Sequence, residues 1–119
     1  MKKLRVLIVE DDAWIAMYLA DMLEEMGYTV VATEGTEEGA VAAAAHHQPD
    51  LMIVDAGLRE GDGVTAVGRI LRAGFVPHVF VSGDTLDGQP LDRRAVVARK
   101  PFLEPDLLRA IEQALGNAE

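Results

Sequence analysis

The chain has 119 residues, no cysteine and a formal net charge of -9, and 50% of its residues are hydrophobic while only 5% are aromatic. This length suits one domain with its own core, so we expect residues 1–119 to form a single domain. Without cysteine, disulfides, thiol catalysis and zinc-thiolate sites are excluded and a cytoplasmic protein is expected, and the acidic charge argues against direct binding of nucleic acid or anionic membranes.

Five apolar segments have the length and the β-branched content of strands. They are residues 5–9, 28–33, 51–55, 77–82 and 95–99. Helical patterns cover residues 12–27, 35–46 and 62–74, and a last helix begins near Pro105. No apolar run is long enough to insert into a membrane. Alternating strands and helices predict an α/β fold, a parallel sheet with helices on both faces.

The connection between the last two predicted strands departs from this alternation. Here Asp87-Gly88-Gln89-Pro90 interrupts any helix and leaves at most a turn near residues 91–94. We therefore expect the fourth helix to be short or irregular.

Residues 51–55, Leu-Met-Ile-Val-Asp, predict a central strand that is buried on both faces. This strand ends at Asp55, and in open α/β sheets ligands bind beyond the carboxyl ends of the strands. A single aspartate at such a position is more often a turn former or a helix cap. Its significance depends on what the other strand ends carry.

Four predicted strands end in chemically reactive side chains. These are Glu10-Asp11-Asp12, Asp55, Ser82-Gly83 and Lys100-Pro101. Each group alone could be an ordinary cap, turn or solvated charge, but in a parallel sheet all four ends lie on one edge. Clustered carboxylates repel each other unless a cation is present, and hard oxygen ligands without histidine or cysteine favour Mg²⁺ together with a phosphoryl group.

A metal and a phosphoryl group at this edge would give each residue a role. Asp55 is the candidate nucleophile, which would form an acyl phosphate. Asp11, with Glu10 acting directly or through water, would hold Mg²⁺. Lys100 would contact one phosphoryl oxygen, and the hydroxyl of Ser82 would donate a hydrogen bond to another.

The chain resembles, over its whole length, the receiver domain of two-component response regulators. The likeness rests on Val-Leu-Ile-Val-Glu-Asp-Asp at residues 6–12, Asp55 with Leu58 and Gly63, Ser82-Gly83 and Lys100-Pro101-Phe102. It implies a doubly wound, flavodoxin-like sheet of five parallel strands in the order 2-1-3-4-5. It also implies a phosphorelay role, in which a sensor histidine kinase or a histidine phosphotransfer protein donates a phosphoryl group and the domain acts as a switch or a shuttle.

The resemblance also assigns site residues. It implies that Asp11, Asp55 and the backbone carbonyl of Gly57 bind the metal, with Glu10 in the outer shell. It implies that Gly57, Gly83 and Asp84 modulate hydrolysis and that the Lys100-Pro101 bond is cis. Such a domain catalyses its own phosphorylation and slow dephosphorylation and is not a metabolic enzyme.

Some positions depart from the family pattern. Arg59 replaces a frequent proline, Gly57 replaces a larger residue, and Val97 occupies the switch position that is often tyrosine or phenylalanine. The segment from Ser82 to Lys100 is also shorter than usual by about one helical turn. We hypothesise that the face formed by this segment is flexible.

Trp14 and Tyr18 lie four residues apart on the first predicted helix, near the acidic cluster. They fit either of two interpretations. They could be core residues, or exposed anchors onto which a kinase or phosphotransfer helix docks.

Alternative functions stay open. A phosphorylation-independent interaction module would fit Val97 and the shortened segment, although such a module has no need for costly clustered carboxylates. FMN binding is disfavoured because Glu10-Asp11-Asp12 would repel its phosphate. A metal-dependent hydrolase would need a substrate pocket, and no feature of this short sequence indicates one. The end of the chain soon after the last helix suits a stand-alone receiver.

Overall fold

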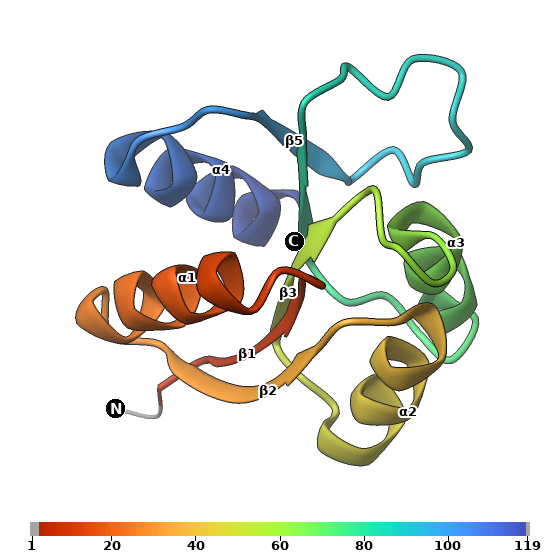
Figure 1. Cartoon of the computed structure of the whole chain (residues 1–119), viewed down its shortest axis with the longest axis horizontal. Helices are drawn as coiled ribbons and strands as arrows, with labels where there is room; N and C mark the ends of the chain where they lie inside the picture. The colour runs from red at the N-terminus through yellow and green to blue at the C-terminus, as the bar shows by residue number, and fades with distance from the viewer. Residues whose placement is uncertain (1–2, 119) are drawn as a thin grey trace.

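The computed structural model describes residues 3–118, which form five strands and four helices (Figure 1). The strands are β1 (Arg5–Val9), β2 (Thr29–Glu34), β3 (Leu51–Asp55), β4 (His78–Ser82) and β5 (Val96–Arg99). The helices are α1 (Ala13–Glu25), α2 (Glu37–His47), α3 (Gly63–Leu71) and α4 (Glu104–Asn117). All strands are parallel and follow the order β2-β1-β3-β4-β5, which confirms the predicted doubly wound sheet.

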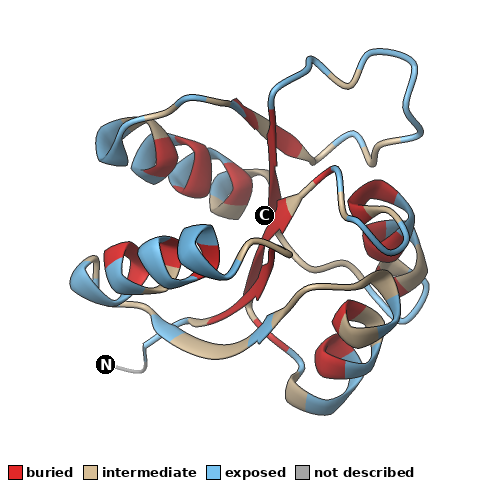
Figure 2. Ribbon diagram, in the orientation of Figure 1, coloured by how far each residue is buried: buried red, intermediate tan, exposed pale blue. Residues whose placement is uncertain are grey.

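The sheet separates two layers of helices. Figure 1 shows α1 and α4 on one face and α2 and α3 on the other. Because successive strand side chains point to opposite faces, Val6 and Ile8 join the core beneath α1 and α4, whereas Leu7 and Val9 join the core beneath α2 and α3. Figure 2 shows the burial concentrated along the strands and on the inner sides of the helices. The central strands are therefore held rigidly from both sides.

Side-chain caps begin three of the helices directly after strand-end loops. The carboxylate of Asp12 accepts hydrogen bonds from the backbone N–H groups of Trp14 and Ile15, at 2.9 and 3.2 Å. Asp62 likewise accepts from the N–H of Thr65 at 2.9 Å and starts α3. Asp12 is therefore the N-cap of α1, and because its Oδ1 is engaged by two backbone donors, it contributes less to the acidic cluster than Glu10 and Asp11 do.

Residues 83–95 connect β4 to β5 without forming a helix. The helix between the last two strands, which the sequence predicts to be short or irregular, is therefore replaced by a loop. Figure 1 shows this segment leaving the sheet as an open loop, and Figure 2 shows that much of it is exposed. Leu86, with a φ of 64°, and Leu91 pack against the core beneath α2 and α3. The side chains of Leu86 and Leu91, and not the apolar face of a helix, thus pack the loop against the domain.

The outer side of α1 is exposed. Trp14 is 80% exposed and Tyr18 is 56% exposed, and Met17 lies between them on the same side. The interpretation of Trp14 and Tyr18 as core residues is therefore wrong, and the interpretation as exposed residues is correct.

None of the helices formed by residues 3–118 has both the length and the apolar character that a bilayer crossing requires.

Candidate functional site

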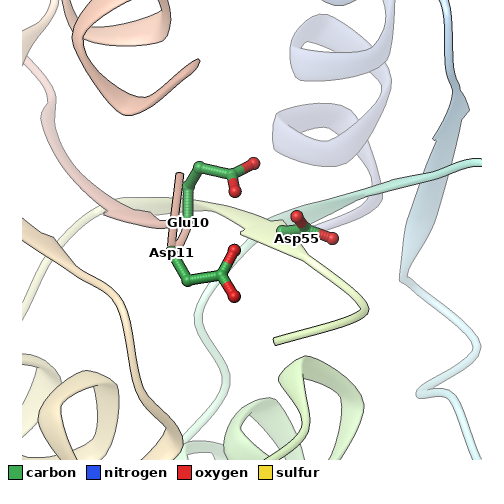
Figure 3. Close-up of side chains that lie close together, drawn as sticks. All are labelled: Glu10, Asp11 and Asp55. Atoms are coloured by element: carbon green, nitrogen blue, oxygen red, sulfur yellow. The ribbon is translucent and has the colours of Figure 1, made fainter. Parts of the chain in front are cut away.

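Three carboxylates converge where β1 and β3 end. Glu10 and Asp11 follow β1, Asp55 is the last residue of β3, and the two strands are paired so that Val9 lies beside Val54. One oxygen of each carboxylate lies within 4.8 Å of the other two. Figure 3 shows the three side chains side by side at this edge. The parallel pairing of two neighbouring strands is therefore what builds the cluster.

Glu10 is buried, with only 4% of its surface exposed. Its Oε2 accepts a hydrogen bond of 3.0 Å from the N–H of Asp12. Burial raises the pKa of Glu10 to about 7, and the negative charge of Asp55 adds to this shift, while the N–H of Asp12 and the charge of Lys100 oppose it. A cation near this group would therefore be strongly favoured once the carboxyl group is ionised.

Asp11 is held by the loop that follows β3. Its Oδ2 accepts a hydrogen bond of 2.7 Å from the N–H of Arg59 and lies 3.7 Å from Nε of the same residue. Burial alone would raise the pKa of Asp11, but the contacts with Arg59 and Glu10 outweigh burial and hold that pKa below its usual value. Asp11 therefore ionises more readily than Glu10, whose pKa is raised.

Asp55 lies between a backbone donor and an ammonium group. Its Oδ1 accepts a hydrogen bond of 3.0 Å from the N–H of Gly57, and Nζ of Lys100 lies 3.3 Å from its Oδ2. The N–H of Lys100 donates to the backbone oxygen of Ser82 at 2.8 Å, which joins the ends of β5 and β4. The Lys100-Pro101 peptide bond is cis, as the family resemblance implies.

Ser82 is buried at the end of β4, with 6% of its surface exposed. Its Oγ accepts a hydrogen bond of 3.0 Å from the N–H of Asp84. Because a hydroxyl can accept and donate at the same time, this contact leaves the proton of Ser82 free for another acceptor. Ser82 and Asp55 share a recess of about 290 Å³, whose wall also includes Gly57, Gly83 and Asp84.

The donor set fits a hard divalent cation. The cluster provides carboxylate oxygens from three residues, with neither histidine nor a thiolate among the donors, and the backbone carbonyl of Gly57 lies on the loop that follows Asp55. Mg²⁺ prefers such oxygen ligands and retains several waters. The chemistry of the site thus matches the expected metal.

The remaining predicted positions lie around this cluster. Tyr18 lines a groove of about 480 Å³ together with Lys100, Pro101 and Phe102, so the exposed side of α1 adjoins the lysine of the site. Val97 lies on β5 beside Phe80 and packs, half-buried, against the core beneath α2 and α3. A short, half-buried aliphatic side chain therefore stands at the position that the family resemblance assigns to the switch.

Two contacts at the site go beyond what the sequence pattern indicates. The departure at Arg59 is visible in the sequence, but its bond to Asp11 joins residues 48 positions apart and has no local signal. The same holds for Glu37, whose Oε1 accepts a hydrogen bond of 3.1 Å from the N–H of Asp62. Both contacts involve backbone donors, which every residue type except proline provides, so residue identity alone does not reveal them.

Comparisons with known proteins agree with this geometry. Residues 6–112 match the family model described as the response regulator receiver domain. The chain is 39% identical over 119 residues to the transcriptional regulatory protein PdtaR of Mycobacterium tuberculosis, an alignment that covers 95% of this chain but only 57% of PdtaR. It is also 39% identical over 117 residues to the chemotaxis protein CheY of Bacillus subtilis, covering 94% of this chain and 98% of CheY.

The solved structures extend the likeness to three dimensions. The solution structure of the PhyR response regulator REC domain of Erythrobacter litoralis matches with a TM-score of 0.83 and 33% identity, covering 98% of this chain and 92% of that one. A family model that spans most of the chain, relatives of this identity and the same fold all lead to one assignment. The chain belongs to the response regulator receiver domains.

Proposed function

We propose that this domain accepts a phosphoryl group on Asp55 from a phosphohistidine of a sensor histidine kinase or a histidine phosphotransfer protein, in a reaction that requires Mg²⁺. The observation that carries the proposal is the position of Asp55. Its carboxylate lies 3.3 Å from Nζ of Lys100 and beside the carboxylates of Glu10 and Asp11. A phosphoryl group there would meet an ammonium group on one side and a metal-binding cluster on the other.

The transfer is a displacement at phosphorus. A carboxylate oxygen of Asp55 forms a bond to phosphorus as the bond from phosphorus to the imidazole nitrogen of the donor breaks, and the electron pair of that bond remains on the imidazole. Asp11, Asp55 and the carbonyl of Gly57 would hold Mg²⁺, with Glu10 in the outer shell, and the ion would neutralise charge on the phosphoryl oxygens. Catalysis of this kind consists mostly of positioning and electrostatics.

Lys100 and Ser82 would bind the remaining phosphoryl oxygens. Lys100 contacts Asp55 directly, so its ammonium group is placed to bind the negative charge both on the carboxylate and, after transfer, on the phosphoryl group. The hydroxyl of Ser82 has its proton free and borders the same recess as Asp55. Gly57, Gly83 and Asp84 line this recess and would control the access of water to the acyl phosphate.

The exposed side of α1 is the surface on which we place the phosphodonor. Trp14, Met17 and Tyr18 leave large apolar areas in solvent, and the groove lined by Tyr18 reaches Lys100. Exposed tryptophan and tyrosine are frequent anchors of protein interfaces. A helix of the donor that packs here would have its phosphohistidine near Asp55.

The proposal is tested by measuring intact mass after incubation with acetyl phosphate, with and without Mg²⁺. We expect wild type to gain one phosphoryl group that requires Mg²⁺ and is stable in acid but labile in base, and Asp55→Asn to gain none. Asp21→Asn is the matched control, because Asp21 is an exposed carboxylate in the second half of α1. A folded wild type that binds Mg²⁺ yet forms no adduct, even with phosphorylated kinases, would favour the phosphorylation-independent interaction module.

A further inference from the structure

Arg59 contacts the metal-binding cluster in two ways. Its backbone N–H donates a hydrogen bond of 2.7 Å to Oδ2 of Asp11, and its Nε lies 3.7 Å from the same oxygen. One carboxylate oxygen of Asp11 is thus engaged by a single residue of the β3–α3 loop. The guanidinium group itself is largely in solvent, since the side chain of Arg59 is 80% exposed.

Glu37, the first residue of α2, holds the β3–α3 loop that carries Arg59. The N–H of Glu37 donates to the backbone oxygen of Glu60 at 3.1 Å, and its Oε1 accepts from the N–H of Asp62 at 3.1 Å. Its Oε2 also accepts a hydrogen bond of 2.9 Å from Arg69 of α3. These contacts hold Glu60 and Asp62, the residues that follow Arg59, and so brace the part of the loop that presents its amide to Asp11.

We infer that Arg59 is a positioning residue for the divalent cation, with two opposite effects on its affinity. The amide orients Asp11 and prepares it for the metal, while the guanidinium places a resident positive charge beside the same carboxylate and weakens metal binding. This inference rests on the metal site of the proposed function and adds how its affinity is set.

The sign of each effect follows from elementary electrostatics. A bound divalent cation and a guanidinium group repel each other and compete for the charge of Asp11, so removing the guanidinium strengthens metal binding. An exposed ion pair is screened by solvent, which limits this gain to about two- to fivefold at low salt. The amide bond to a charged carboxylate fixes its direction, and its loss weakens binding by about threefold or more.

The test is a calorimetric titration of the full chain with MgCl₂, without any phosphodonor. Arg59→Ala keeps the backbone N–H and removes the guanidinium, and we expect it to bind Mg²⁺ about two- to fivefold more tightly than wild type. The difference should shrink at about 0.5 M NaCl, because salt at this concentration screens interactions between exposed charges. Arg72→Ala removes the same charge from the opposite end of α3 and should leave the affinity unchanged. An Arg59→Ala protein that binds Mg²⁺ no more tightly than wild type would overturn the role of the guanidinium.

A second variant isolates the amide. Arg59→Pro lacks both the guanidinium and the backbone donor, so comparison with Arg59→Ala reports the N–H alone. We expect Arg59→Pro, shown to be folded by its circular dichroism, to bind Mg²⁺ about threefold or more weakly than Arg59→Ala. Equal affinities of these two variants would overturn the orienting role of the amide.

Failure of this inference is distinguishable from failure of the proposed function. If wild type shows no binding of Mg²⁺ at millimolar concentrations, the metal site itself is wrong and both proposals fall. If wild type binds Mg²⁺ and the affinities of wild type, Arg59→Ala and Arg59→Pro are equal, only the role of Arg59 is wrong. Should the proline variant not fold, the comparison of Arg59→Ala with Arg72→Ala still decides the effect of the guanidinium.

Discussion

Burial of Glu10 links the charge of the site to the stability of the fold. Its pKa rises from 4.5 to about 7, chiefly because its carboxyl group is buried. The unfolded chain loses this proton near the ordinary value, so between the two values the folded state binds more protons than the unfolded state. The stabilising contribution of Glu10 is therefore fully present below about pH 4.5 and is lost as the pH rises through about 7.

We predict that Glu10→Gln makes the metal-free protein more stable at pH 8, by about 1 to 3 kcal/mol, because glutamine has nearly the same shape and no charge to bury. At pH 5 the two proteins should differ much less. Urea unfolding in EDTA at both pH values measures this, with the exposed Glu24→Gln on α1 as the control. The prediction is wrong if Glu10→Gln and wild type lose stability equally between pH 5 and pH 8.

At the scale of elements, the start of α3 is pressed against the end of β3. The N–H of Gly63 donates to the backbone oxygen of Ala56 at 3.1 Å, and a Cβ added at Gly63 would overlap the backbone oxygen of Asp55. Gly68, in the same helix, has open space where its Cβ would lie. The two glycines of α3 thus have different roles, close approach at one and none at the other.

We predict that Gly63→Ala destabilises the domain by about 1 to 3 kcal/mol, because the methyl group forces apart the backbone of β3 and α3. Gly68→Ala should instead stabilise it by about 0.5 to 1 kcal/mol, since alanine favours the helix and meets no neighbour. Thermal or urea unfolding of both variants is the measurement. A Gly63→Ala protein as stable as Gly68→Ala would show that the close packing of α3 against β3 does not matter.

The exposed side of α1 gives a second prediction at this scale. We predict that Trp14→Ala slows phosphoryl transfer from a phosphorylated histidine kinase by roughly tenfold, because an anchor of the interface is lost. Phosphorylation by acetyl phosphate should be unchanged, and so should stability, because Trp14 buries little surface in the domain. Trp14→Phe, which keeps an aromatic ring, should retain most of the transfer rate. Unchanged transfer in Trp14→Ala would remove α1 as the docking surface.

For the molecule as a whole, we expect the acidic charge and the proposed metal site to act together. The formal net charge is -9, and three carboxylates of this excess are concentrated at one edge of the sheet. A cation that binds only the folded state stabilises it by mass action. The benefit should be larger above the pKa of Glu10, where that carboxyl group is also ionised.

We predict that Mg²⁺ at ten times its dissociation constant raises the free energy of unfolding by about 1.4 kcal/mol at pH 8. Asp11→Asn should abolish most of this gain, because it removes a proposed metal ligand. Thermal unfolding with MgCl₂ and with NaCl of equal ionic strength separates specific binding from general screening. Equal stabilisation by both salts would contradict a specific site.

Sequence patterns predict the frame of this molecule well. Strand periodicity and the reactive residues at strand ends are local properties, so they place Asp55, Asp11 and Lys100 at one edge once the sheet is known to be parallel. Helical spacing alone does not tell how wide the buried stripe of α1 is, and for this reason it left the exposure of Trp14 and Tyr18 open. The bond from Arg59 to Asp11 was not predictable, because it depends on the course of a loop.

The brace at Glu37 has a thermodynamic consequence. The chain of contacts runs from α2 through the β3–α3 loop to Asp11, without passing through the hydrophobic core. If metal binding alters this loop, linkage requires reciprocity: whatever factor Mg²⁺ applies to the affinity of a molecule bound at the N-terminus of α2, that molecule applies to the affinity for Mg²⁺. Under that condition, a partner bound at the start of α2 would change the affinity for Mg²⁺ beside Asp55, the proposed phosphoacceptor, and bound Mg²⁺ would change the affinity for that partner by the same factor.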